Sequence, residues 1–345
     1  IKLIMAYTTV PKSTAYFNTL LYNGNDTADT TITGVGFQSD FTWIKSRLDT
    51  ENHNLFDAVR GGGYRLYSNL NDAQSYIATT LTSWNSDGFV VGTDDGVNKT
   101  NGKFASWNWK ANGLGSANSD GTITSTYTSA NATSKCSIVK WTGTGSNATV
   151  GHGLGVIPKI ILMKKLSGSA GWVVYHNSIG AGNYLRLNTT ATSSGDANIF
   201  NNTTPTSSVF SLGTDADNNG SGSTYVAYCF ADVPGFSKIS SYTGNGSANG
   251  AFVYTGFKPA FVLIKNTAAS EAWFLYDNKR GYNGSMTALF PDETAADASA
   301  NNIDLLSNGF KLRTGGAILN ANGTKYIYMA FAGEPLVSTN GNAAT

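Results

Sequence analysis

The chain has 345 residues, a formal net charge of +1 and only 13% charged residues, against roughly 25% in an average soluble protein. This length predicts more than one domain, and the near-neutral charge gives no electrostatic support for nucleic-acid binding. No apolar run approaches the roughly 18 residues of a membrane-spanning helix, so we expect no membrane insertion. The apolar start at 1–6 is too short for a signal peptide, and Met5 has the form of a natural start.

Three copies of one sequence unit follow one another along the chain. In each copy an apolar strand ends at a lysine, a second strand follows, and the last strand has alternating aromatic residues. The apolar strands are at 39–45, 158–164 and 259–265, the second strands at 53–57, 172–176 and 273–277, and the last strands at 104–109, 225–230 and 326–331. The second and third copies are 101 residues apart at both ends (158 to 259 and 230 to 331), and the first and second are 119 to 121 apart (39 to 158 and 109 to 230).

The strand pattern predicts an all-β protein. Strands with period-two alternation are separated by clusters of Gly, Asn, Asp and Ser, and no helix of ordinary length is indicated. A unit of roughly 100 residues fits two packed antiparallel sheets, so we predict three consecutive β-sandwiches. The predicted boundaries are an N-terminal extension at 1–11, sandwiches at 12–113, 134–232 and 236–337, a flexible linker at 114–133 and a C-terminal tail at 338–345. The second junction, at 232–235, is predicted to be a tight elbow.

Catalytic patterns are weak in this sequence. The only histidines, His53, His152 and His176, stand in different contexts, which argues against a shared metal site. No Gly-x-Ser-x-Gly motif lies between a strand and a helix, and no strand carries the paired carboxylates of a glycosidase. We therefore expect a protein without enzymatic activity, with a glycan-degrading enzyme as a remote alternative.

One loop is similar to a calcium site. Asp215, Asp217 and Asn219 match the alternate oxygen ligands of a calcium loop, and Gly220 stands at the turn position. Val226 occupies the place of the bidentate glutamate, so a polar hairpin tip is the favoured interpretation and calcium the alternative. No other cofactor is expected.

A pair of opposite charges recurs in two copies and is absent from the middle one. Asp57 and Arg60, with Tyr64 nearby, correspond to Asp277 and Arg280 with Tyr282, while the second copy has His176 and Ile179. An aspartate and an arginine could hydrogen-bond the hydroxyls of a sugar that stacks on the tyrosine. The alternative, which we favour, is a structural ion pair that holds a turn.

Other recurrent residues have structural interpretations. Lys45, Lys164 and Lys265 are predicted to protect sheet edges from pairing. Trp107 and Trp109 are predicted to pack in a core or between domains. The two cysteines exclude a disulfide-stapled scaffold, and Cys229 is predicted to be a buried thiol within a strand.

Several segments carry a resemblance to a known family. The sequences at 5–9, 36–47, 81–89 and 150–155 resemble a repeated domain of unknown function from virion proteins of tailed bacteriophages, especially marine ones. The resemblance implies a lectin-like jelly roll, similar to concanavalin and laminin-G sandwiches, on the virion surface after synthesis in the cytoplasm of a bacterial host. The expected function is a receptor-binding tail-fibre module for host surface glycan, with a capsid decoration protein as the alternative.

The expected partners are other virion proteins and host surface carbohydrate. Sandwich edges need protection, and few charges are available to supply it. We therefore expect a homo-oligomer, with a trimer favoured, in which apolar and aromatic side chains of neighbouring chains meet at the axis.

Overall fold

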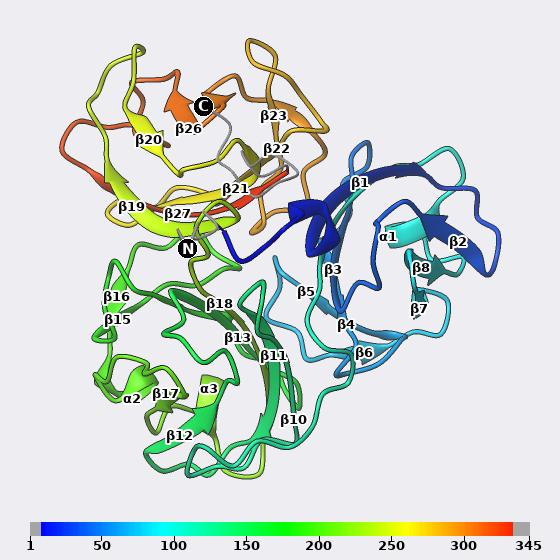
Figure 1. Ribbon diagram of the computed structural model, residues 1–345, viewed down its shortest axis with the longest axis vertical. Helices are drawn as coiled ribbons and strands as arrows, with labels where there is room; N and C mark the ends of the chain where they lie inside the picture. Colours follow the sequence, from blue (N-terminus) through cyan, green and yellow to red (C-terminus); the bar gives the residue numbers. More distant parts are fainter. Residues whose placement is uncertain (1–7, 334–345) are drawn as a thin grey trace, which may run out of the picture.

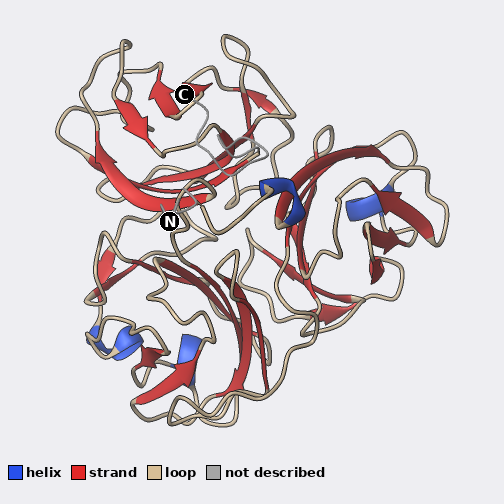
Figure 2. Cartoon of the chain, in the orientation of Figure 1, coloured by secondary structure: helices blue, strands red, loops and turns tan. Residues whose placement is uncertain are grey.

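The computed structural model describes residues 8–333, and β-strands dominate it (Figure 2). The helices there are single short turns: η1 (Ser13–Ala15), α1 (Asp95–Asn98), α2 (Ala197–Phe200) and α3 (Ala216–Asn219). The all-β prediction is therefore confirmed. Within 8–333 no helix is long and apolar enough to cross a membrane. Most of the predicted extension at 1–11 and all of the predicted tail at 338–345 lie outside the described residues.

The strands form three units around a common centre (Figure 1). Each unit has a large antiparallel sheet with the same core order of four strands, β1-β9-β3-β4, β11-β18-β13-β14 and β19-β27-β21-β22. In unit one these strands are β1 (Phe17–Asn23), β9 (Lys103–Trp109), β3 (Phe41–Ser46) and β4 (Asn54–Asp57), extended by β5 (Tyr64–Tyr67) and β6 (Ser75–Tyr76). In unit two they are β11 (Cys136–Thr142), β18 (Thr224–Phe230), β13 (Ile160–Lys165) and β14 (Val173–His176). In unit three they are β19 (Ser237–Thr243), β27 (Lys325–Ala332), β21 (Pro259–Asn266) and β22 (Phe274–Asp277).

A smaller sheet covers the outer face of each large sheet. It consists of β2 (Thr30–Thr33), β8 (Gly88–Val91) and β7 (Leu81–Asn85) in unit one, β12 (Ala148–Gly151) and β17 (Val209–Leu212) in unit two, and β20 (Phe252–Tyr254), β26 (Gly309–Leu312) and β25 (Ile303–Leu306) in unit three. Two further short sheets have two strands each. In one, β15 (Asn183–Tyr184) pairs with β16 (Ser194–Gly195), and in the other, β23 (Thr287–Ala288) pairs with β24 (Ala298–Ser299). Each unit therefore has its own apolar core between two sheets.

The large sheets are buried on both faces, which explains why their strands are almost continuously apolar. In β13, Ile161 and Met163 pack into the core of unit two, while Ile160 and Leu162 face a fourth cluster shared by all three units. We call this cluster the central core. A sheet covered on both sides favours uninterrupted apolar runs over strict alternation.

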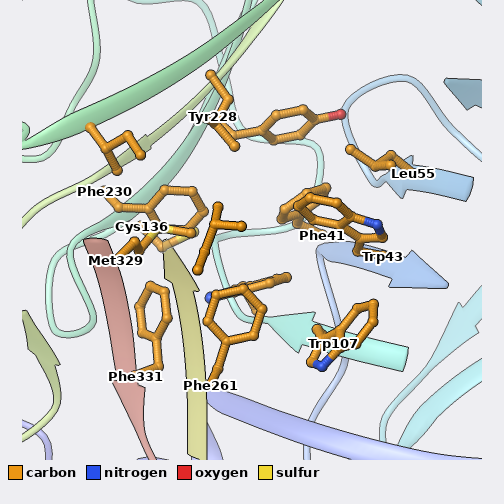
Figure 3. Packing of buried hydrophobic residues seen from close by; sticks show 14 of the residues in the cluster. Phe41, Trp43, Leu55, Trp107, Cys136, Tyr228, Phe230, Phe261, Met329 and Phe331 are labelled. Atoms are coloured by element: carbon orange, nitrogen blue, oxygen red, sulfur yellow. The ribbon is translucent and has the colours of Figure 1, made fainter. Parts of the chain in front are cut away.

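Three aromatic rings close the central core at its axis. Trp109, Phe230 and Phe331 come from equivalent places in the last strands of the three units. Their ring centroids form a nearly equilateral triangle with sides of 5.8, 5.7 and 5.6 Å. Figure 3 shows aromatic side chains from all three units meeting in this region. One chain by itself thus forms an aromatic axis, and an axis between separate chains stays a prediction.

The segment predicted as a flexible linker belongs to unit two, so that prediction is wrong. Its strand β10 (Tyr127–Asn131) pairs along β11, and Ile123 forms a parallel bridge to Val150 and is buried. The additional residues between the first two copies therefore cover one edge of the large sheet and one edge of the smaller sheet of unit two. The polar, glycine-rich composition did not reveal this role. The predicted tight elbow is confirmed by a turn in which Phe236 N donates to Val233 O.

The prediction that three strand-end lysines protect sheet edges is also wrong. Lys45, Lys164 and Lys265 are fully buried, and their Nζ atoms donate to backbone carbonyls. Lys164 reaches Asn71 O of unit one, and Lys265 reaches the equivalent Thr190 O of unit two at 2.7 Å. Burial lowers the pKa of each lysine to about 8. Lys164 and Lys265 therefore hold loops of the neighbouring unit, whereas Lys45 bonds Ser46 O and Asp49 O of its own unit.

We expect one cooperative unfolding transition, because the three units share the central core. Phe331→Ala removes one corner of the axial triangle and should lower the free energy of unfolding of the whole chain by about 3–5 kcal/mol. Urea titration followed by tryptophan fluorescence and by circular dichroism measures both effects. Tyr254→Ala, at a residue that is 61% exposed, is the control and should change the free energy by less than about 0.5 kcal/mol. Separate transitions for the units would contradict the shared core.

Candidate functional site

The two predicted Asp–Arg pairs lie buried between units and not on an open surface. Asp57 Oδ2 accepts from Arg60 Nε and also from the hydroxyl of Tyr228 in unit two, at 2.7 Å. Asp277 Oδ2 accepts from Arg280 Nε and from Trp107 Nε1 in unit one, at 3.0 Å. All four charged side chains are almost completely buried.

These pairs are therefore structural, and their assignment to sugar binding is corrected. Burial opposes the charge on Arg60, but Asp57 and Tyr228 outweigh it, so the pKa of Arg60 is raised. The other two Arg60 nitrogens also bond the protein, since Nη2 donates to Leu55 O and Nη1 donates to Tyr64 O. The favoured interpretation from the sequence, an ion pair that holds a turn, describes these residues, and the structure adds the partner from the neighbouring unit.

The middle copy changes this set as a whole. His176 Nε2 lies 3.4 Å from Tyr328 O in unit three, and Ser178 N donates to His176 Nδ1. Ile179 stands at the position of the arginine. Met329, in the central core, stands at the position that Tyr228 and Trp107 occupy at the other two junctions. A junction that lacks the carboxylate thus also lacks the guanidinium and the polar partner. This joint replacement avoids an unpaired buried charge.

Backbone hydrogen bonds repeat at all three junctions. Gln74 N donates to Leu166 O, Ser193 N to Thr267 O and Asp297 N to Arg47 O. In addition, Trp172 Nε1 donates to Tyr67 O, and Trp273 Nε1 donates to Arg186 O. Unit one therefore contacts unit two, unit two contacts unit three, and unit three contacts unit one through equivalent groups. The chain forms a closed ring with pseudo-three-fold symmetry.

The predicted calcium loop is a capped helical turn. Asp215 Oδ1 accepts from Asp217 N as the N-cap of α3, and Asp217 forms an ion pair with Arg186 at 2.6 Å. Asn219 is buried and donates to Ser146 O and Gly213 O. Within residues 8–333 no group of three His, Cys, Asp or Glu side chains could hold a metal ion. The oxygen ligands proposed from the sequence are thus engaged with the protein itself.

An asparagine recurs at the same place in all three units, and its constant spacing could have revealed it in the sequence. Asn98, Asn219 and Asn320 are 121 and 101 residues apart, like the last strands of the copies. Each side chain bonds backbone groups of the turn that opens its unit. A Cβ on the glycine of that turn, for example Gly24, would lie 2.2 Å from Lys99 O. Glycine is therefore needed in this turn for close backbone contact, which is a structural role.

A polar cleft lies on unit three, beside the place where this unit meets unit one. Two hollows of about 190 and 350 Å³ share Lys258 and Asn278. The first is also lined by Asn18 and Lys279, and the second by Tyr282. We call the two together the junction cleft. Their volumes together fall in the range of roughly 300–1,000 Å³ that is typical of small-molecule sites.

The loop that carries Tyr282 is held in place although its ring is exposed. The Tyr282 side chain is 73% exposed. Its neighbour Asn283 forms two hydrogen bonds with the backbone of Leu305, of 3.0 and 2.8 Å, and Ser285 N donates to Tyr282 O. Tyr64, the other predicted stacking residue, is 37% exposed and packs edge-on against Tyr76 at 5.1 Å, outside this cleft. Of the two predicted tyrosines, only Tyr282 lines a hollow.

The third junction differs from the other two in its covalent connection. At the first junction Asp40 Oδ2 accepts from Ala111 N in the chain segment that leaves unit one. At the second, Asp232 binds Lys238 and accepts from Ile239 N. The equivalent groove at the third junction lies between Ala260 and Gly333 of unit three and the first strand of unit one. No linking segment crosses it in the described part of the chain.

Fold and cleft together define a ring of three β-sandwich units with a polar cleft beside the junction of units three and one. The chain belongs to the family described as a domain of unknown function (DUF7483), whose model matches residues 12–335. No curated protein and no solved structure matches the chain. The description of this family assigns no activity to its members. The function is therefore inferred from the residues of this chain.

Replacing the polar set of the first junction tests whether it acts as a unit. Asp57→His alone leaves Arg60 buried without its carboxylate and should lower the free energy of unfolding by about 3–5 kcal/mol. Adding Arg60→Ile and Tyr228→Met copies the second junction and should restore the free energy to within about 2 kcal/mol of wild type. Urea denaturation of the three chains measures this. A triple variant no more stable than Asp57→His would show that the positions are not coupled.

Acid should destabilise the ring through its buried histidines. Burial lowers the pKa of His176 to about 4 from an ordinary value of 6.5, so between these values the unfolded chain binds a proton that the native chain does not. Stability should therefore fall as the pH is lowered from about 6.5 to 4, at up to about 1.4 kcal/mol per pH unit for this residue. Urea midpoints at several pH values should show a shallower slope for His176→Gln, and an unchanged slope would contradict the assignment.

Proposed function

We propose that this chain is a non-catalytic bacteriophage virion surface protein that binds a host surface glycan, as a receptor-binding module of a tail fibre. The observation that carries the proposal is the junction cleft. It combines an exposed tyrosine ring on a fixed loop with side-chain amides and amines. Sugars are recognised by such a combination, because the ring covers an apolar sugar face while polar groups bond the hydroxyls.

The ring architecture supports a binding role. The three units share one core and are joined by hydrogen bonds at every junction, so the cleft is built from two units that do not move independently. A site that is already ordered loses little conformational entropy when a ligand binds. The resemblance of the sequence to phage virion domains supplies the expected context, and the expected homo-oligomer would add affinity through several weak sites.

A second function, capsid decoration, is favoured by the pseudo-three-fold arrangement. A molecule with three equivalent lobes can contact a three-fold position on another assembly with the same surface of each lobe. Such positions occur in a capsid lattice. In this alternative the outer loops of all three units contact virion proteins.

A glycan array probed with the full chain, together with gold-labelled virions under the electron microscope, distinguishes the alternatives. Binding to host polysaccharide and label at the tail tip are expected. A lattice of label over the head, without glycan binding, would favour capsid decoration. Release of reducing sugar ends from the polysaccharide would contradict a non-catalytic role.

Two tyrosine variants test where the glycan binds. Tyr282→Ala should weaken glycan binding about tenfold, because the stacking face is lost. Tyr64→Ala changes the other tyrosine proposed from the sequence, and Tyr254→Ala is an exposed control, so neither should alter the dissociation constant. If Tyr64→Ala alone weakens binding, the site lies in unit one and not in the junction cleft.

A further inference from the structure

The junction cleft carries positive charge that the protein leaves unbalanced. Lys258 and Lys279 are exposed and line the same hollow together with Asn278. Neither lysine forms an ion pair with an acidic side chain in residues 8–333. Two other cations near the junctions form ion pairs: Arg47 binds Asp297, and Lys238 binds Asp232. Two ammonium groups that have no ion-pair partner among residues 8–333 thus lie at one site.

The other two units show that the fold does not need these residues. In unit one the positions of Lys258, Lys279 and Tyr282 are occupied by Gln38, Val59 and Gly62, and in unit two by Ile157, Ser178 and Ala181. The equivalent strands still form the same sheets in all three units. The two lysines and the tyrosine are therefore a local addition to unit three, beside the groove where this unit meets unit one.

The geometry of the cleft suits an oxyanion attached to a sugar. Lysine is a compact point charge with three donors, and it binds carboxylate or phosphate from several directions. Low-dielectric walls of a cleft strengthen this attraction compared with a flat surface. Lys258 and Asn278 line both hollows, so a ligand whose anionic group lies near the lysines can extend toward Tyr282. The amide of Asn278 supplies a donor and an acceptor for a hydroxyl between them.

We infer that the junction cleft selects an anionic glycan, whose carboxylate or phosphate group lies between Lys258 and Lys279 and whose sugar ring stacks on Tyr282. This inference rests on the proposed glycan-binding function and adds the chemical class of the ligand. It also distinguishes unit three from the other two units, which keep the frame without the site. The binding is an equilibrium association with no covalent step.

The test measures the full chain against matched acidic and neutral glycans. The probes are uronate oligosaccharides with their methyl esters, and phosphorylated oligosaccharides with their dephosphorylated forms, because each pair differs only in charge. Biolayer interferometry gives the dissociation constants. The wild-type chain should prefer the acidic member of at least one pair about tenfold or more, and this preference should shrink when salt is raised.

Charge-matched variants assign the effect to the cleft. Lys258→Gln with Lys279→Gln should remove the preference for the acidic member, because an amide carries no charge that attracts the anionic group. Lys103→Gln with Lys140→Gln changes the net charge equally at lysines outside the cleft and should keep the preference. All four positions have solvent-accessible side chains, and circular dichroism confirms that each variant is folded.

Four results would overturn the inference, and they differ in what they say of the proposed function. Equal binding of acidic and neutral glycans, or a preference that survives in the Lys258→Gln, Lys279→Gln chain, contradicts the anionic site while glycan binding stands. Loss of the preference in the Lys103→Gln, Lys140→Gln chain shows that net charge and not the cleft is responsible. Absence of binding to every glycan contradicts both proposals.

Discussion

The large sheets of this protein are apolar on both faces, and the rest of the structure depends on that constraint. One face of each sheet is covered by the smaller sheet of its own unit. The other face can be removed from water only by another unit, and three units do so by meeting at Trp109, Phe230 and Phe331. A sandwich cut out of the ring would expose its central face to water, at a cost of roughly 25 cal/mol for each Å² of apolar surface. Ring closure is therefore part of the folding of every unit.

Polar groups inside the ring follow from the same constraint, because a buried donor, acceptor or charge must find a partner. The first and third junctions use a carboxylate that accepts from an arginine of its own unit and from Tyr228 or Trp107 of the next unit. The second junction uses a neutral histidine, and its other positions are apolar. Three buried lysines bind loop carbonyls. Different chemistry at equivalent positions thus leads to one geometry.

The ring is symmetric in its frame and asymmetric at its surface, and the candidate site lies where the symmetry is broken. Two junctions are crossed by the chain, whereas the third brings unit three against unit one without a covalent link. A groove remains there, and unit three alone has added Lys258, Lys279 and Tyr282 beside it. Repetition provides a rigid frame three times over, which leaves individual copies free to acquire ligand contacts while the core stays the same. This division of roles is consistent with a binding protein whose stability and recognition depend on different residues.

The sequence by itself determined the all-β class, the repeated pattern and the buried places of Trp107, Trp109 and Cys229, because these depend on local periodicity and on constant spacing. It also singled out Asp57 with Arg60 and Asp277 with Arg280, yet one strand pattern cannot show that a polar side chain is buried by another unit. The same limit explains the errors at Lys45, Lys164 and Lys265 and at the segment 114–133, whose role depends on the edges that it covers. Only the tertiary structure decided which faces of the sheets meet, which tyrosine remains exposed and where a groove stays open. These features are set by contacts between residues about 100 or more positions apart, and such contacts leave no local signal in the sequence.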